Sequence, residues 1–250
     1  MIVDLEICIG FGSATAPLRA VNLTAFDVGQ TAAYVGANHI LSVDGHFHDY
    51  VEQLNWAAFP TLPAVPHFPH HPLLTGISSK TPSTDVAGMI GEGITAIVLK
   101  QLAQLQTTDI VTLEASRTVK TPDFAVQLPA NWLANAGISV PNGVPAFPAW
   151  WPVEAKACQR LGNSMRAAAW RGLQQLVSYW RRIRVASSAE VGFGIVVVFK
   201  YDNLPTSPPQ LRAHVFLPLD QAQLLIELEA VGVVAKTRAT LERKGILYGI

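Results

Sequence analysis

Hydrophobic and polar residues alternate strictly at the start of the chain. From Met1 to Ile9, apolar side chains fall at every second position from Val3, with mostly polar ones between them. A period of two is typical of a strand that buries one face, so we predict an N-terminal β-strand. Further along, residues 59–82 hold six prolines, a density that excludes helix and sheet. We interpret this run as the connector that ends an N-terminal region, residues 1–82.

The period becomes helical after this connector. Between residues 86 and 106, apolar side chains recur every three or four positions, and residues 83–85 precede them as candidate N-caps. A second stripe of this kind predicts a long helix over 158–184. Both helices belong to a second region, residues 83–250.

Short apolar runs between and after these helices predict strands. They lie at 110–115, 123–128, 150–157, 191–201 and 211–217. A last helix is predicted at 220–230, and the proline-rich residues 129–149 form an insertion between two strands. The order from residue 83 is helix, three strands, helix, two strands, helix. This order predicts the α/β fold class, with a central mixed sheet flanked by helices and an N-terminal extension that contains β structure.

The composition adds no further element to this predicted fold but excludes several classes of protein. Half of the 250 residues are hydrophobic, 14% are charged, and 18 basic residues balance 18 acidic ones. A chain of this kind forms a core, so disorder, coiled coil and collagen are excluded. No apolar run is long enough to span a membrane, and we expect a cytoplasmic protein. The two cysteines, Cys8 and Cys158, give neither a disulfide framework nor a zinc spacing.

The histidines and glycines carry no strong motif. His67, His70 and His71 lie among prolines, without the helical spacing of a zinc site, so we interpret them as surface or packing residues. Gly10 and Gly12 are not followed by the Gly-Lys-Ser/Thr of a phosphate-binding loop. This absence argues against an NTPase.

Three acids and one lysine fall at positions from which they could form a catalytic or metal-binding site. Glu92 lies in the first predicted helix, and Asp123 begins a predicted strand. Glu154 and Lys156 are two apart in the next strand, so their side chains share a face. Converging carboxylates repel one another unless a hard cation neutralises them, and Mg²⁺ or Mn²⁺ takes such oxygen ligands. We therefore predict a Mg²⁺ site, with Mn²⁺ as a substitute, beside a lysine that can orient or deprotonate an attacking water.

The sequence around these residues resembles a known family. The segments TPDF at 121–124 and VEAK at 153–156 follow a predicted helix that carries GEG at 91–93. This pattern is similar to that of the PD-(D/E)xK nuclease superfamily. The resemblance implies a restriction-endonuclease-like αβββαβ core and metal-dependent hydrolysis of DNA. The resemblance also assigns Asp123 and Glu154 as metal ligands.

The resemblance also gives roles to residues of the two helices and the second strand. Glu92 would be the helix acid that supports the metal, and Lys156 the catalytic lysine. Gln175 and Tyr179 match the QxxxY motif of the RecB-like branch, whose Gln and Tyr lie beside the active site. The resemblance therefore adds both to the candidate catalytic residues.

Basic residues gather after the Glu-x-Lys motif. Residues 155–189 contain no Asp or Glu but hold seven of the 18 basic residues. The candidates for nucleic-acid binding are Arg160, Arg166, Arg171, Arg181 and Arg182. Three of these arginines are 11 positions apart, close to three helical turns. This spacing places them on one face of a helix, where they could contact successive phosphates of a nucleic-acid backbone. The alternative is a solvated helix face whose acidic partners come from elsewhere in the fold.

The leading hypothesis is thus a Mg²⁺-dependent deoxyribonuclease. A non-catalytic DNA-binding or assembly module that keeps the nuclease fold is the second hypothesis, with residues 1–82 as the surface for a protein partner. RNA as substrate and a homodimer stay open as alternatives. Endo- or exonuclease action, strand preference and biological pathway are not readable from the sequence.

Overall fold

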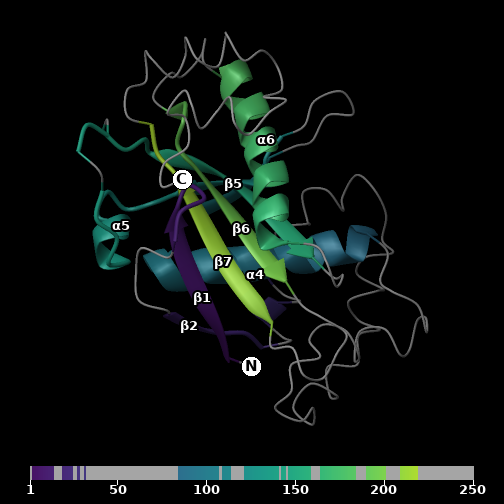
Figure 1. Ribbon diagram of the computed structural model, residues 1–250. Coiled ribbons are helices and arrows are strands. Elements are labelled where there is room, and N and C mark those ends of the chain that lie inside the picture. The colour runs from purple at the N-terminus through teal and green to yellow at the C-terminus, as the bar shows by residue number, and fades with distance from the viewer. Residues whose placement is uncertain are drawn as a thin grey trace, which may run out of the picture.

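A seven-stranded mixed β-sheet forms the centre of the described part of the chain (Figure 1). The computed structural model describes residues 2–13, 19–24, 27–28, 31, 84–106, 109–113, 121–140, 142–144, 146–158, 164–183, 190–200 and 209–218. The predicted connector at 59–82 and the predicted helix at 220–230 lie outside these residues. The α/β class is confirmed, since helices pack on a mixed sheet.

The strands come from both ends of the described chain. They are β1 (Ile2–Ile9), β2 (Arg19–Asn22), β3 (Ile110–Thr112), β4 (Phe124–Gln127), β5 (Trp150–Cys158), β6 (Gly194–Lys200) and β7 (Gln210–Phe216). Their order in the sheet is β2-β1-β7-β6-β5-β4-β3. Only the pairs β1–β7 and β5–β6 are parallel. All predicted strands between 110 and 217 are confirmed, each with somewhat different ends.

The N-terminal strand is an inner strand of this sheet. The predicted alternation is confirmed, because Val3, Leu5 and Ile7 are buried in the core. β1 pairs with β2 on one side and, in parallel, with β7 on the other. The sheet therefore includes strands from both sides of the predicted division at residues 82 and 83, and that division itself lies outside the described residues.

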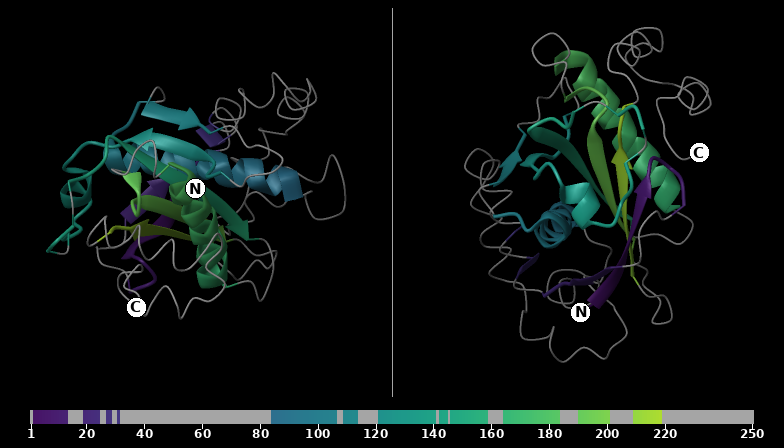
Figure 2. Two further views of the ribbon diagram at one scale, coloured as in Figure 1. Left: turned by 90° about the horizontal axis from the view of Figure 1, so that it is seen from above. Right: turned by 90° about the vertical axis from the view of Figure 1, so that its left-hand side faces the viewer.

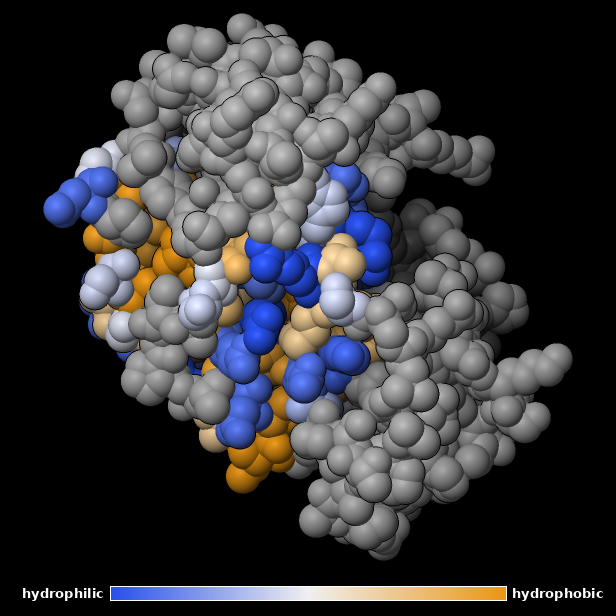
Figure 3. All heavy atoms as spheres, in the orientation of Figure 1, coloured by the Kyte–Doolittle hydropathy of each residue, from blue (hydrophilic) through white to orange (hydrophobic). Residues whose placement is uncertain are grey.

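Two long helices cover opposite faces of the sheet (Figure 2). α4 (Thr84–Ala103) shares a core with Val153 and Ala155 of β5, and α6 (Met165–Ile183) shares the other core with Val196 and Val198 of β6. Hydrophilic side chains lie over α6 on its outer side (Figure 3). None of the helices in the described ranges is long and apolar enough to cross a membrane.

The predicted start of the second long helix is wrong. Cys158 is the last residue of β5, because it continues the period of two set by Glu154 and Lys156. α6 begins instead at Met165, directly after Ser164, whose Oγ accepts a hydrogen bond of 3.0 Å from the backbone N–H of residue 167. A serine in this role is an N-cap, and it was the signal for the helix start.

The predicted insertion links the antiparallel neighbours β4 and β5. It contains a short helix, α5 (Trp132–Asn135), that the sequence pattern did not predict. Trp132 packs edge-on against Trp151 of β5, with ring centroids 5.4 Å apart, and Phe147 contacts the same ring. These aromatic contacts attach the described part of the insertion to the sheet.

Gly172 marks a close approach of α6 to the sheet. A Cβ atom at this position would lie 2.5 Å from Cγ1 of Val196 and 3.3 Å from Cγ of Glu154. Because the branched side chain of Val196 is 0% exposed, Gly172→Ala should push the helix off the sheet. We expect the free energy of unfolding to fall by about 1–3 kcal/mol, measured by urea denaturation.

Gly88 of α4 provides the matched control, since a Cβ there would meet no atom within 4 Å. Gly88→Ala removes backbone freedom from the unfolded chain without a clash. It should raise the free energy of unfolding by about 0.5–1 kcal/mol. A loss of the same size in both variants would contradict the close packing at Gly172.

Candidate functional site

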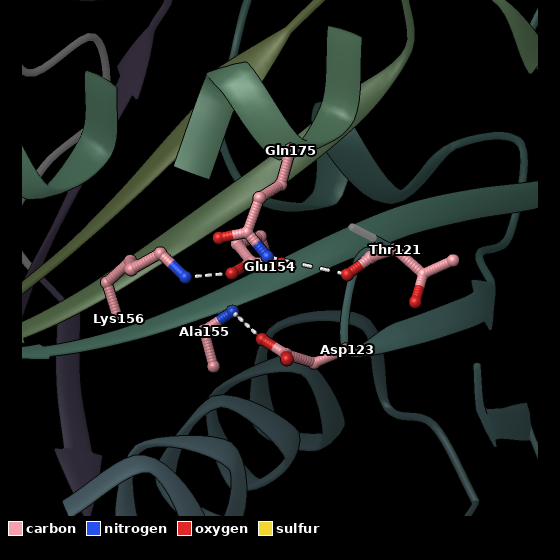
Figure 4. A network of polar contacts seen from close by, with 6 residues as sticks. All are labelled: Thr121, Asp123, Glu154, Ala155, Lys156 and Gln175. Carbon is pink, nitrogen blue, oxygen red and sulfur yellow. Dashed lines mark hydrogen bonds and ion pairs between the residues drawn. The ribbon is translucent and has the colours of Figure 1, made fainter. Parts of the chain in front are cut away.

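The centre of the candidate site is a buried carboxylate on β5. Glu154 is 0% exposed and lies on the face that α6 covers, beside Val196 of β6 and under Gly172. Lys156, two residues on, projects from the same face and forms an ion pair with Oε1 of Glu154 (Figure 4). The lysine side chain is 21% exposed, so it joins the buried acid to the surface.

The second oxygen of Glu154 is unusual. Oε2 is buried and has no hydrogen-bond partner among the described residues. A buried carboxylate oxygen that accepts no hydrogen bond has lost its hydration without replacement, which costs free energy. The lysine offsets the charge at one oxygen, and the other oxygen accepts no hydrogen bond from the described residues.

Asp123 is held against the same strand. It directly precedes β4, and its Oδ2 accepts a hydrogen bond of 2.7 Å from the backbone N–H of Ala155. That N–H belongs to the peptide that follows Glu154, so the two acids flank one peptide group of β5 (Figure 4). The structure thus brings together the two predicted ligands of the TPDF and VEAK segments.

Glu92 approaches from the opposite helix. A Cβ on its neighbour Gly91 would lie 3.1 Å from the Cβ of Ala157, so α4 is closely packed against β5 here. The pKa of Glu92 is raised to about 8: burial raises it most, the Asp123 carboxylate adds to the rise, and Lys156 partly offsets it. Glu92 therefore lies within electrostatic range of both residues and holds a proton at neutral pH in the absence of a cation.

The two residues of the QxxxY match have different partners. Gln175 points from α6 toward β5 and donates a hydrogen bond of 3.4 Å to the carbonyl oxygen of Thr121, two residues before Asp123 (Figure 4). Tyr179 donates one of 3.4 Å to Oε2 of Glu190, just before β6. Burial raises the pKa of Glu190, and this hydrogen bond lowers it in part. Glu190 was not predicted, although it is the acid that ends the acid-free stretch.

The predicted arginine row is described only in part. Arg160 and the side chains of Arg181 and Arg182 lie outside the described residues. Arg171 is exposed on α6, whereas the Arg166 guanidinium lies 5.8 Å from the ring centroid of Phe11. Five residues on a helix turn the side chain by about 140°, so Arg166 and Arg171 point to different sides of α6.

A second polar cluster lies on the neighbouring strands of the same face. The buried ring of His214 on β7 contacts the Gly10 carbonyl oxygen through Nδ1 at 2.7 Å and packs near Phe11. Burial lowers the pKa of His214 to about 4, so this histidine is neutral at pH 7. Arg212 forms an ion pair with Glu6 on β1. Sequence reasoning missed this cluster because its members are about 200 positions apart.

The donor set at the candidate site suits a hard cation only in part. Within the described ranges, no three His, Cys, Asp or Glu side chains come close enough together to hold a metal ion. The predicted three-acid metal site therefore stays a prediction. The pair Asp123 and Glu154 supplies carboxylate oxygens of the kind that Mg²⁺ takes, including the buried Oε2 without a hydrogen bond.

The arrangement combines carboxylate oxygens with a nitrogen that can stabilise negative charge. Asp123 and Glu154 lie at one peptide of β5, and Lys156 extends from them to the surface. Groups of this kind, fixed before a substrate binds, are what charge stabilisation in hydrolysis requires. Comparison of the chain with family models, curated proteins and solved structures finds no significant match.

Proposed function

We propose that this protein is a metal-dependent nuclease that hydrolyses phosphodiester bonds of DNA. The observation that carries the proposal is the state of Glu154: one oxygen is paired with Lys156, and the other is buried and unused within the described residues. A cation bound at that oxygen would compensate the part of the buried carboxylate charge that Lys156 does not compensate. Substrate phosphate would supply its further ligands.

Each residue of the site has a task in this proposal. Mg²⁺ held by Asp123 and Glu154 would polarise a phosphoryl oxygen and lower the pKa of a bound water. Lys156 holds the attacking water or donates to the negative charge that develops at phosphorus. Glu92 holds a proton at neutral pH and, once ionised, would support a bound cation as a carboxylate. Gln175 fixes the segment that leads into Asp123.

The order of elements supports the proposal. The described chain runs α4, β3, β4, β5, α6, β6, apart from the short α5, and β6 lies parallel to β5. This agrees with the αβββαβ order that the resemblance to PD-(D/E)xK nucleases implies. The finer assignment to a restriction-endonuclease-like core is part of the proposal, as is the branch with the QxxxY motif.

A DNA-binding module without turnover is the second candidate. The ion pair between Lys156 and Glu154 favours it, because the lysine nitrogen occupies one of the oxygens that a cation would use. The lack of a three-ligand group in the described ranges favours it as well. This module would retain DNA and leave it uncut with every divalent cation.

Metal-dependent cleavage separates the two candidates. Purified protein is incubated with supercoiled plasmid, linear duplex and single-stranded DNA, with Mg²⁺, Mn²⁺ or EDTA. We expect cutting with Mg²⁺ and Mn²⁺ and none with EDTA, because Asp123 and Glu154 alone cannot polarise the phosphate. Equal cutting with EDTA would contradict metal dependence. No cutting together with retained DNA would support the binding module, and RNA tested in parallel addresses the alternative substrate.

A further inference from the structure

Two lysines lie near each other at the carboxyl ends of β5 and β6, and Arg171 of α6 lies within electrostatic range of Cys158 at the same ends. The two strands are parallel, with Lys156 opposite Val198 and Cys158 opposite Lys200. Side chains of paired residues project from the same face of a sheet, and residues two apart do so as well. Lys156 and Lys200 therefore point to the face under α6. We call the set Lys156, Arg171 and Lys200 the basic rim.

The pKa of the Cys158 thiol is sensitive to all three of these charges. Burial raises its pKa, whereas Arg171, Lys200 and Lys156 each lower it, in that order. Arg171 extends from the exposed side of α6, and Lys200 is partly exposed at the end of β6. All three cations thus lie within electrostatic range of one buried atom, although they come from three different elements.

Two of the three elements that carry the basic rim have no acidic side chain. α6 and β6 contain no Asp or Glu. Neither Arg171 nor Lys200 forms an ion pair with a carboxylate that the structure describes. Cations without such a pair raise the local positive potential and attract a polyanion. This surface borders the acids at Glu154, so a bound anion would meet both.

The distance between the two lysines of the basic rim indicates which kind of polyanion it could bind. With 3.3 Å per residue and about 4.8 Å between strands, the Cα atoms of Lys156 and Lys200 are about 8 Å apart. A single nucleic-acid strand places neighbouring phosphates at a comparable distance. We propose that Lys200 and Arg171 hold the DNA phosphate next to the one that meets Lys156, and so direct the backbone across the ends of β5 and β6. The identity of this polyanion rests on the proposed function.

Binding of DNA in EDTA tests the rim without cleavage. The full chain and its Lys200→Gln variant are titrated into fluorescently labelled duplex and single-stranded DNA at several salt concentrations. We expect Lys200→Gln to raise the Kd about fivefold and to reduce the salt slope for duplex by about 0.9, as loss of one phosphate contact requires. Lys200→Arg should keep the parental Kd.

Lys100→Gln on α4 is the matched control, because it removes the same charge from the opposite face of the sheet. It should leave Kd and slope within twofold of the parent. Equal effects of Lys100→Gln and Lys200→Gln would mean that only net charge matters and would overturn the rim. Parental binding by Lys200→Gln would overturn it as well.

Different results would contradict the proposed nuclease activity and the proposed role of the basic rim. If the parent cuts DNA and Lys200→Gln binds and cuts equally well, the rim is wrong and the nuclease stands. If neither the parent nor any variant cuts DNA but Lys200→Gln binds DNA more weakly than Lys100→Gln does, the basic rim is supported and the proposed nuclease activity is wrong. Circular dichroism of each variant verifies that the fold is retained.

Discussion

Replacing Lys156 with methionine is expected to lower the rate of DNA cleavage by about 10²- to 10⁴-fold. Methionine keeps an unbranched apolar stem beside Glu154 but cannot orient water or donate to the charge that develops at phosphorus. Single-turnover cleavage of plasmid with saturating Mg²⁺ measures the chemical step. Parental rates in Lys156→Met would remove the lysine from the mechanism.

Stability has to be measured beside this rate, because Lys156 also compensates a buried carboxylate. Breaking a buried ion pair from one side costs about 3–5 kcal/mol. The double variant Glu154→Gln with Lys156→Met removes both charges and should recover much of that loss while remaining inactive. Lys100→Met on α4 serves as the control for both measurements and should cut at the parental rate.

The second large effect is expected from Glu92 and pH. Its pKa is about 8 in the folded protein and 4.5 in the unfolded chain. The folded state therefore keeps a proton that the unfolded state has lost, and stability falls as pH rises from 4.5 to 8. The full difference corresponds to up to about 5 kcal/mol above pH 8. Glu92→Gln, which stays neutral, should be more stable than the parent at pH 9 by an amount of this order.

Urea denaturation at pH 5, 7 and 9 in EDTA measures this difference. The two proteins should be similar near pH 5 and should separate as pH rises. Added Mg²⁺ should narrow the gap at pH 9, because a cation near Glu92 favours its ionised form. Parallel stability profiles over the whole range would show that the folded pKa of Glu92 is close to its ordinary value.

Periodicity predicted the long elements of the fold well. β1 and the two long helices were found because each carries an apolar pattern over eight or more residues. β2 and α5 have four residues each, too few for a period to be recognised. The pairing of β1 with β7 was out of reach for another reason: it joins residues about 200 positions apart, and no local pattern encodes that contact.

The candidate site was predictable where it depends on one strand. Glu154 and Lys156 had to share a face, and the structure pairs them. The hydrogen bond from Ala155 to Asp123 depends on how β4 and β5 align after a long excursion, which the sequence does not encode locally. The same holds for the partners of Gln175 and Tyr179, which lie outside their helix.

The inner position of β1 has a consequence for synthesis of the chain. Its partner β7 ends at Phe216, and the ion pair between Glu6 and Arg212 spans 206 positions. At about 5–20 residues per second, the ribosome leaves the β7 side of β1 unpaired for about 10–40 s. An apolar strand with an open edge readily joins other chains during that interval. We therefore expect the yield of folded protein to respond to translation speed and to chaperones that shield residues 2–9, as well as to the final stability of the sheet.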